Sequence, residues 1–125
     1  MFFPIEEWFP AFVLTVLVEG VVVLAGFRDT GVSPPRLAVM LLFANLATHQ
    51  AVWFVYTQLF LVGTIEYLVA AESWAAAAEA LFYWAVLPGV SVRRVIAVAV
   101  AANALSFVTG RVLQELLPEL LRLPT

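Results

Sequence analysis

The chain has 125 residues, of which 64% are hydrophobic and 12% are charged, and its mean hydropathy is +1.02. A soluble domain of this length carries about twice that charged fraction and cannot bury so much apolar surface, so the composition predicts an all-α integral membrane protein. The net charge of −3 and the lack of a basic stripe argue against a nucleic-acid partner, and the absence of cysteine excludes disulfides and thiolate metal sites.

Long apolar segments of the chain predict membrane-spanning helices. A helix that crosses a bilayer needs about 20 mostly apolar residues. Four segments meet this requirement, and they cover about residues 8–27, 37–61, 67–87 and 92–112. The sequence therefore predicts four transmembrane helices within a single membrane domain, residues 1–125.

Turn signals separate these helices. Glycine and proline mark the first break at residues 28–35 and the third at residues 88–91, and a weaker signal marks the second at Gly63 and Thr64. Ser91 is a candidate N-cap for the fourth helix. The polar and apolar residues of 113–125 predict a short interfacial tail.

The arginines predict the orientation in the membrane. They flank the first break, at Arg28 and Arg36, and the third, at Arg93 and Arg94, whereas the middle break carries no basic residue. Arginine-bearing loops stay on the cytoplasmic side, so both termini and the middle loop are expected outside. Tyr83 is expected near the inner membrane interface, where tyrosine and tryptophan are enriched.

Two glutamates within apolar segments are each followed by the same series of polar residues. Asn45 follows Arg36 at the same distance as Asn103 follows Arg94, and a hydroxyl residue comes three positions after each asparagine. We interpret this as an internal duplication, with repeat 1 at about 8–61 and repeat 2 at about 67–112. The two helical hairpins would be related by a pseudo-two-fold axis along the membrane normal. The matched residues are Glu19, Arg36, Asn45 and Thr48 in repeat 1 and Glu79, Arg94, Asn103 and Ser106 in repeat 2.

The glutamates and asparagines are expected at one depth. Each lies nine residues from the arginine or proline that marks the same end of its helix. At about 1.5 Å per residue this is about 13 Å, close to the midplane of the bilayer. Because polar groups avoid lipid, Glu19, Asn45, Glu79 and Asn103 should face one another inside a four-helix bundle.

Four further residues extend this polar core toward the outer face. Thr48 and His49 follow Asn45 on one helical stripe, Ser106 follows Asn103, and Glu72 precedes Glu79 by two turns. His49, Glu72 and Glu79 are weak candidates for metal ligands, since no known zinc-binding spacing is present. The pattern specifies no cofactor.

Two functions fit this polar core. Carboxyl and imidazole groups in a line can relay protons or bind a cation, which favours proton-linked or cation-linked transport, or ion binding. Alternatively, the Glu–Asn pairs are structural clamps in a non-catalytic scaffold or accessory subunit of a membrane complex. No catalytic motif is evident, so an enzyme is disfavoured. The lipid bilayer is the expected partner, and the small size is compatible with a homodimer or a larger membrane complex.

Overall fold

The computed structural model describes residues 5–117, and it confirms the predicted all-α class. The predicted breaks at residues 63–64 and 88–91 fall between helices, and the break at 28–35 does so except for its last two residues, Pro34 and Pro35, which begin α2. Residues 113–116 of the predicted interfacial tail continue the last helix, and residues 118–125 lie outside the described part. The elements are α1 (Ile5–Gly26), α2 (Pro34–Gln50), the π-helix η1 (Ala51–Tyr56), α3 (Thr57–Leu59), α4 (Ile65–Val86) and α5 (Val92–Leu116).

The helix boundaries follow from local chemistry. The hydroxyl of Thr64 accepts a hydrogen bond from a backbone N–H in the first turn of α4 (3.3 Å), and the hydroxyl of Ser91 does the same for α5 (3.2 Å). These bonds satisfy N–H groups that have no partner within the helix. Each connection also contains one glycine with positive φ, namely Gly31, Gly63 and Gly89 (79°, 89° and 78°). Glycine adopts this conformation without steric cost, so these positions reverse the chain direction.

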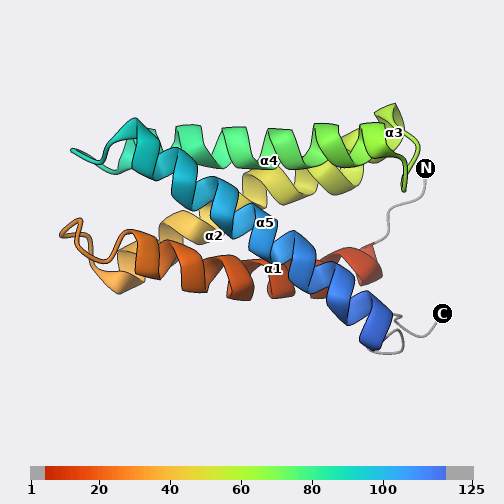
Figure 1. The fold of residues 1–125 in the computed structure, drawn as a ribbon, viewed down its shortest axis with the longest axis horizontal. Coiled ribbons are helices and arrows are strands. Elements are labelled where there is room, and N and C mark those ends of the chain that lie inside the picture. The colour runs from red at the N-terminus through yellow and green to blue at the C-terminus, as the bar shows by residue number, and fades with distance from the viewer. Residues whose placement is uncertain (1–4, 118–125) are drawn as a thin grey trace.

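The long helices pack around a common centre. α1 packs against α2 and α5, and α4 packs against the same two helices. In Figure 1, α1 and α4 lie on opposite sides of the molecule and α5 crosses between them. The α1–α2 and α4–α5 connections lie together at one end, which we call the arginine end. The start of α1, the end of α5 and α3 lie at the opposite end, which we call the termini end.

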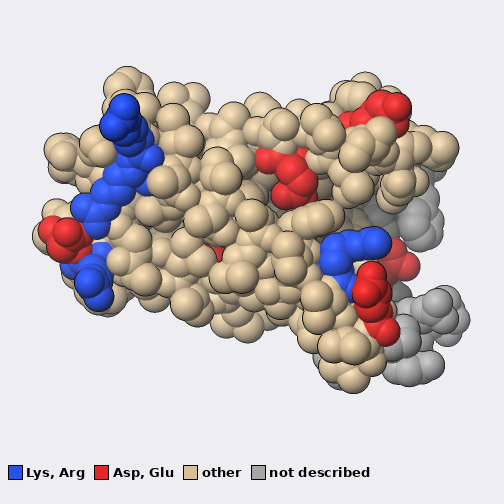
Figure 2. Space-filling view, in the orientation of Figure 1, with Lys and Arg blue, Asp and Glu red and all other residues tan. Residues whose placement is uncertain are grey.

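The surface of the helices suits a membrane. Three helical stretches are long and apolar enough to cross a bilayer, Glu7–Gly26, Pro34–Leu59 and Val92–Leu116. Large apolar side chains point outward from them, including Leu17 and Val21, which are 65% and 68% exposed. Figure 2 shows an outer surface that is largely uncharged, with most charged side chains near the two ends. We therefore treat the chain as membrane-inserted. α4, which carries three glutamates, is not among the three stretches.

An apolar cluster fills the bundle toward the arginine end. Tyr83 belongs to it and is 0% exposed, so its side chain packs between the helices. Its predicted depth near the inner membrane interface stays a prediction. Tyr83 packs against Phe27, with ring centroids 5.4 Å apart. The other buried members of this cluster are Val23, Leu37, Leu41, Ala44, Leu87, Val95, Val98 and Ala102.

One arginine ties α5 to the end of α1. The guanidinium of Arg94 donates two hydrogen bonds to the backbone oxygen of Gly26 (2.9 and 2.6 Å) and forms an ion pair with Asp29. It thereby satisfies a carbonyl group that has no partner at the C-terminus of a helix. Arg36 is exposed and has no hydrogen-bond partner among residues 5–117, so the two arginines with matched sequence positions make different contacts.

Candidate functional site

Two buried carboxyl groups lie at the centre of the molecule. Glu19 on α1 and Glu79 on α4 are each 1% exposed. The Asn45 amide donates to Glu19 Oε2 (2.9 Å), and the Asn103 amide donates to Glu79 Oε2 (2.8 Å). Both predicted Glu–Asn pairs are therefore confirmed. Each amide also bonds the carbonyl oxygen one turn earlier in its own helix (3.2 and 2.9 Å), which fixes the orientation of the side chain.

The hydroxyl groups connect the two pairs. The Thr48 hydroxyl lies 3.0 Å from Glu79 Oε1, and the Ser106 hydroxyl lies 3.0 Å from Glu19 Oε1. Each hydroxyl thus contacts the glutamate of the other Glu–Asn pair. As a result, Glu19 on α1 is bonded to α2 and α5, and Glu79 on α4 is bonded to the same two helices. The sequence predicted the pairs but not this exchange of partners.

Each hydroxyl group has two possible acceptors and only one proton to donate. Thr48 Oγ1 lies 3.0 Å from the carbonyl oxygen of Ala44 as well as from Glu79. When Glu79 is ionised, the hydroxyl donates to the carboxylate. When Glu79 is protonated, the acid donates to Thr48 Oγ1 and the hydroxyl donates to the backbone. The same positions of the heavy atoms therefore accommodate both protonation states.

The second carboxyl group has the same arrangement. Ser106 Oγ lies 3.0 Å from Glu19 Oε1 and 3.0 Å from the backbone oxygen of Asn103. Glu19 can therefore also bind or release a proton without moving its neighbours. Each hydroxyl group can reverse its hydrogen bond by rotation, because it has one proton and can both donate and accept.

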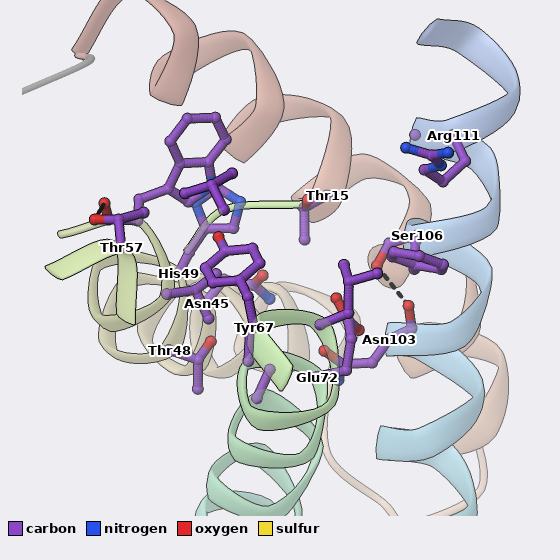
Figure 3. A pocket seen from close by; sticks show the side chains of 18 of the residues that line it. Thr15, Asn45, Thr48, His49, Thr57, Tyr67, Glu72, Asn103, Ser106 and Arg111 are labelled. Carbon is purple, nitrogen blue, oxygen red and sulfur yellow. Dashed lines mark hydrogen bonds between the residues drawn. The ribbon is translucent and has the colours of Figure 1, made fainter. Parts of the chain in front are cut away.

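A cavity of about 640 Å³ reaches both carboxyl groups. Figure 3 shows Asn45, Glu72 and Asn103 around it, with a dashed hydrogen bond between Ser106 and Asn103. At the termini end it reaches exposed residues such as Val62, and toward the arginine end the apolar cluster begins. All eight residues of the predicted polar core line it, namely Glu19, Asn45, Thr48, His49, Glu72, Glu79, Asn103 and Ser106.

The cavity also has members that the sequence interpretation did not single out. Trp53, Tyr67 and Phe107 contribute aromatic surface, and Arg111 lies at its outer part. Phe107 and Arg111 lie one and two turns after Asn103 on the same face of α5. Extending that face by two turns in the sequence would therefore have predicted them. Trp53 lies in the π-helix η1, and the sequence did not predict a π-helix there.

Acidic groups dominate the charge inside the cavity. Besides Glu19 and Glu79, two further carboxyls line it, Glu7 and Glu72. Glu72 interacts electrostatically with both Glu19 and Glu79. Within residues 5–117, Glu72 has no hydrogen-bond donor, in contrast to Glu19 and Glu79. Arg111 is the one arginine among the described residues that line the cavity. Among the described lining residues, carboxyl groups therefore outnumber arginines.

His49 lies beside the cavity among aromatic rings. Its ring centroid lies 6.1 Å from that of Trp8, 5.5 Å from Phe12 and 6.0 Å from Trp53. Its Nδ1 atom is buried and finds no partner in the described part of the chain. The π-helix η1 begins two residues later, and π-helical segments are often found at functional sites.

The weak metal-site candidates do not form a ligand set. No three histidine, aspartate or glutamate side chains of the described residues come together in an arrangement that could hold a metal ion. His49, Glu72 and Glu79 all line the cavity, but as separate groups. The chemistry that the site offers is therefore that of carboxyl groups and their hydrogen-bond donors.

Comparisons with protein-family models, curated proteins and solved structures return no match to this chain. The fold and the site together define a helical protein with candidate membrane spans, in which buried glutamates are hydrogen-bonded to asparagine, serine and threonine.

Proposed function

We propose that this protein crosses the membrane four times and binds protons or small cations at Glu19 and Glu79 as part of a transport cycle. The observation that carries the proposal is the cavity, which reaches two buried carboxyl groups whose hydrogen bonds accommodate both protonation states. Ionisable groups inside membranes are costly and usually functional. No catalytic motif is needed for this role, and the protein is proposed not to be an enzyme.

The fourth span in this proposal is α4. Its glutamates lower its hydropathy, but Glu79 is 1% exposed and Glu72 lines the cavity, so neither requires contact with lipid. The arginines at the arginine end favour a cytoplasmic location for that end. The cavity then opens to the outside, and the apolar cluster with Tyr83 closes the path toward the cytoplasm.

The matched contacts support a duplicated origin for the single domain. In both halves a glutamate pairs with the asparagine of the next long helix, and the hydroxyl residue one turn beyond contacts the other half. We propose that the halves are two parallel hairpins with two equivalent ion-binding carboxyls. A homodimer or a larger membrane complex would supply further surface for the conformational change, since four helices enclose little volume.

A structural role is the second candidate. All four carboxylate oxygens of Glu19 and Glu79 have hydrogen-bond partners, which is what a clamp between membrane helices requires. A clamp, however, does not need a cavity that reaches it, nor a third carboxyl without a donor. These two features favour the ion-binding role.

The test is proton movement in proteoliposomes. Purified protein would be reconstituted with an internal pH-sensitive dye, and pH and Na⁺ or K⁺ gradients would be applied across the membrane. We expect dye responses that are reduced by Glu19→Gln or Glu79→Gln and abolished by the double substitution. Glu66→Gln is the matched control, because Glu66 is exposed on the same helix as Glu79 and does not line the cavity.

The result that would contradict the proposal is equally specific. If the folded double variant responds as strongly as a responding wild-type protein, Glu19 and Glu79 are not the ion-binding groups. If the wild-type protein itself gives no response, the clamp and accessory-subunit role is favoured. Folding of each variant would be checked by circular dichroism and by gel filtration in detergent.

A further inference from the structure

We propose that the cavity binds a small organic cation with an aromatic or aliphatic body, and not only a proton or a bare metal ion. This inference rests on the proposed function, because it places the cation beside the same carboxyl groups. The volume of the cavity suits a small organic molecule. The cavity measures about 640 Å³, within the range of about 300 to 1,000 Å³ that is typical of small-molecule sites. A transition-metal site is instead a tight cluster of histidine and carboxylate ligands, and no three such side chains of the described residues form one.

The charged groups that line the cavity favour a cation. Glu19 and Glu79 have protein donors on both oxygens, whereas Glu72 has no hydrogen-bond donor among the described residues. Glu72 is half-buried and faces the cavity (Figure 3). Together with Glu7, which is exposed and also lines the cavity, it is therefore a carboxylate that remains available to a ligand. A cation beside Glu72 would also reduce its repulsion with Glu19 and Glu79.

The aromatic side chains that line the cavity suit an organic cation. Trp53 from η1, Tyr67 from α4 and Phe107 from α5 line the cavity from three sides of the bundle. Aromatic faces attract positively charged groups and also pack against apolar ones. Carboxylates next to aromatic surface therefore match a ligand that combines a positive charge with an apolar body. An inorganic cation would use the carboxylates alone.

The direct test is binding of benzyltrimethylammonium to the purified protein in detergent. Isothermal titration calorimetry would measure the affinity, and tryptophan fluorescence would report contact with the cavity. Benzenesulfonate, of similar size and opposite charge, is the control ligand and is expected not to bind. Glu72→Gln should weaken binding of the cation about tenfold or more, and the exposed control Glu66→Gln should leave it unchanged.

A variant that fills the cavity separates this inference from the proposed function. A Cβ atom added at Gly110 meets no atom within 4 Å, and Gly110 lines the cavity, so Gly110→Leu extends into open space. Leucine is also a better helix former than glycine, which favours folding of this variant. We expect Gly110→Leu to bind benzyltrimethylammonium more weakly while its pH-dependent response through Glu19 and Glu79 remains.

The outcomes are distinguishable. Absence of binding by wild-type protein that still responds to pH through its carboxyls overturns the organic-cation inference and leaves the proposed function standing. Binding that is equal for benzyltrimethylammonium and benzenesulfonate, or insensitive to both Glu72→Gln and Gly110→Leu, also overturns it. Binding of the cation by a protein that shows no pH response at Glu19 and Glu79 supports the cavity site and contradicts the proton-linked role.

Discussion

Glu79→Gln and Glu79→Leu should have different effects on stability. In the Glu79→Gln variant, the new side-chain oxygen can accept from the Asn103 amide, and the new NH₂ group can donate to Thr48 Oγ1 while that hydroxyl donates to the backbone oxygen of Ala44. Glutamine thus reproduces the protonated acid bond for bond. We expect the free energy of unfolding of Glu79→Gln to lie within about 1 kcal/mol of the wild-type value.

Glu79→Leu removes both of these hydrogen bonds, at 2.8 and 3.0 Å. Hydrogen bonds between membrane helices contribute about 0.6 to 2 kcal/mol each, so the loss is about 1 to 4 kcal/mol in total. The lower half of this range is expected, because Asn103 and Thr48 each keep a backbone acceptor in their own helix. The predicted destabilisation is therefore about 1 to 2 kcal/mol.

The assay is unfolding by sodium dodecyl sulfate in mixed micelles, followed by circular dichroism. Glu66→Gln and Glu66→Leu are the matched controls, since Glu66 is exposed near the start of the same helix. The reasoning is refuted if Glu79→Gln destabilises the protein as much as Glu79→Leu. In that event both carboxylate oxygens must accept hydrogen bonds permanently, and a neutral state of Glu79 is not accommodated.

Three further predictions concern the arginine end. Gly26→Ala should lower the free energy of unfolding by about 1 to 3 kcal/mol in the same assay, because its Cβ would lie 2.6 Å from Val98 Cγ2. Gly110→Ala should leave it unchanged, because a Cβ there meets nothing within 4 Å. Equal effects of the two substitutions would show that the α1–α5 contact is not tight. Arg94→Gln should cost about 1 kcal/mol by releasing the end of α1, and hydrogen exchange at that end should increase; unchanged exchange there would contradict the tie. The hydrogen bond from Arg94 lowers the pKa of Asp29 below its usual value of 3.8, so this ion pair contributes above pH 3.8 and is lost as the pH falls through the lowered pKa. Because Asp29 is exposed, Asp29→Asn should leave the melting temperature nearly unchanged at neutral pH, and a large shift would contradict this.

Much of the fold was predictable because it depends on local signals. Composition indicates a membrane protein, and the breaks contain the glycines and prolines that end helices. The predicted spans therefore agree with α1, α4 and α5 and with the stretch Pro34–Leu59 to within a few residues. The π-helix η1 was not predictable, because nothing in the sequence of residues 51–56, AVWFVY, distinguishes a π-helix from an α-helix.

The Glu–Asn pairs were predictable because they require only equal depth on neighbouring helices. Counting residues from the helix ends is enough to bring Glu19 to Asn45 and Glu79 to Asn103. The exchange of hydroxyl partners was not predictable, since it depends on how α2 and α5 are placed between α1 and α4. The complete burial of Tyr83 was not predictable for a related reason. A tyrosine near a helix end is usually interfacial, but here the apolar cluster covers it completely.

The most direct test of the central claim is whether Glu19 and Glu79 change protonation in the folded protein. Infrared difference spectra between two pH values would report the carbonyl stretch of protonated carboxyl groups. We predict a pH-dependent band that is reduced in Glu19→Gln and in Glu79→Gln, falls in the double variant to the contribution of the remaining carboxyl groups, and keeps the Glu19 and Glu79 components in Glu66→Gln. A band that is unchanged in the folded double variant would contradict the account, because the buried carboxyls would then serve only to hold the helices together.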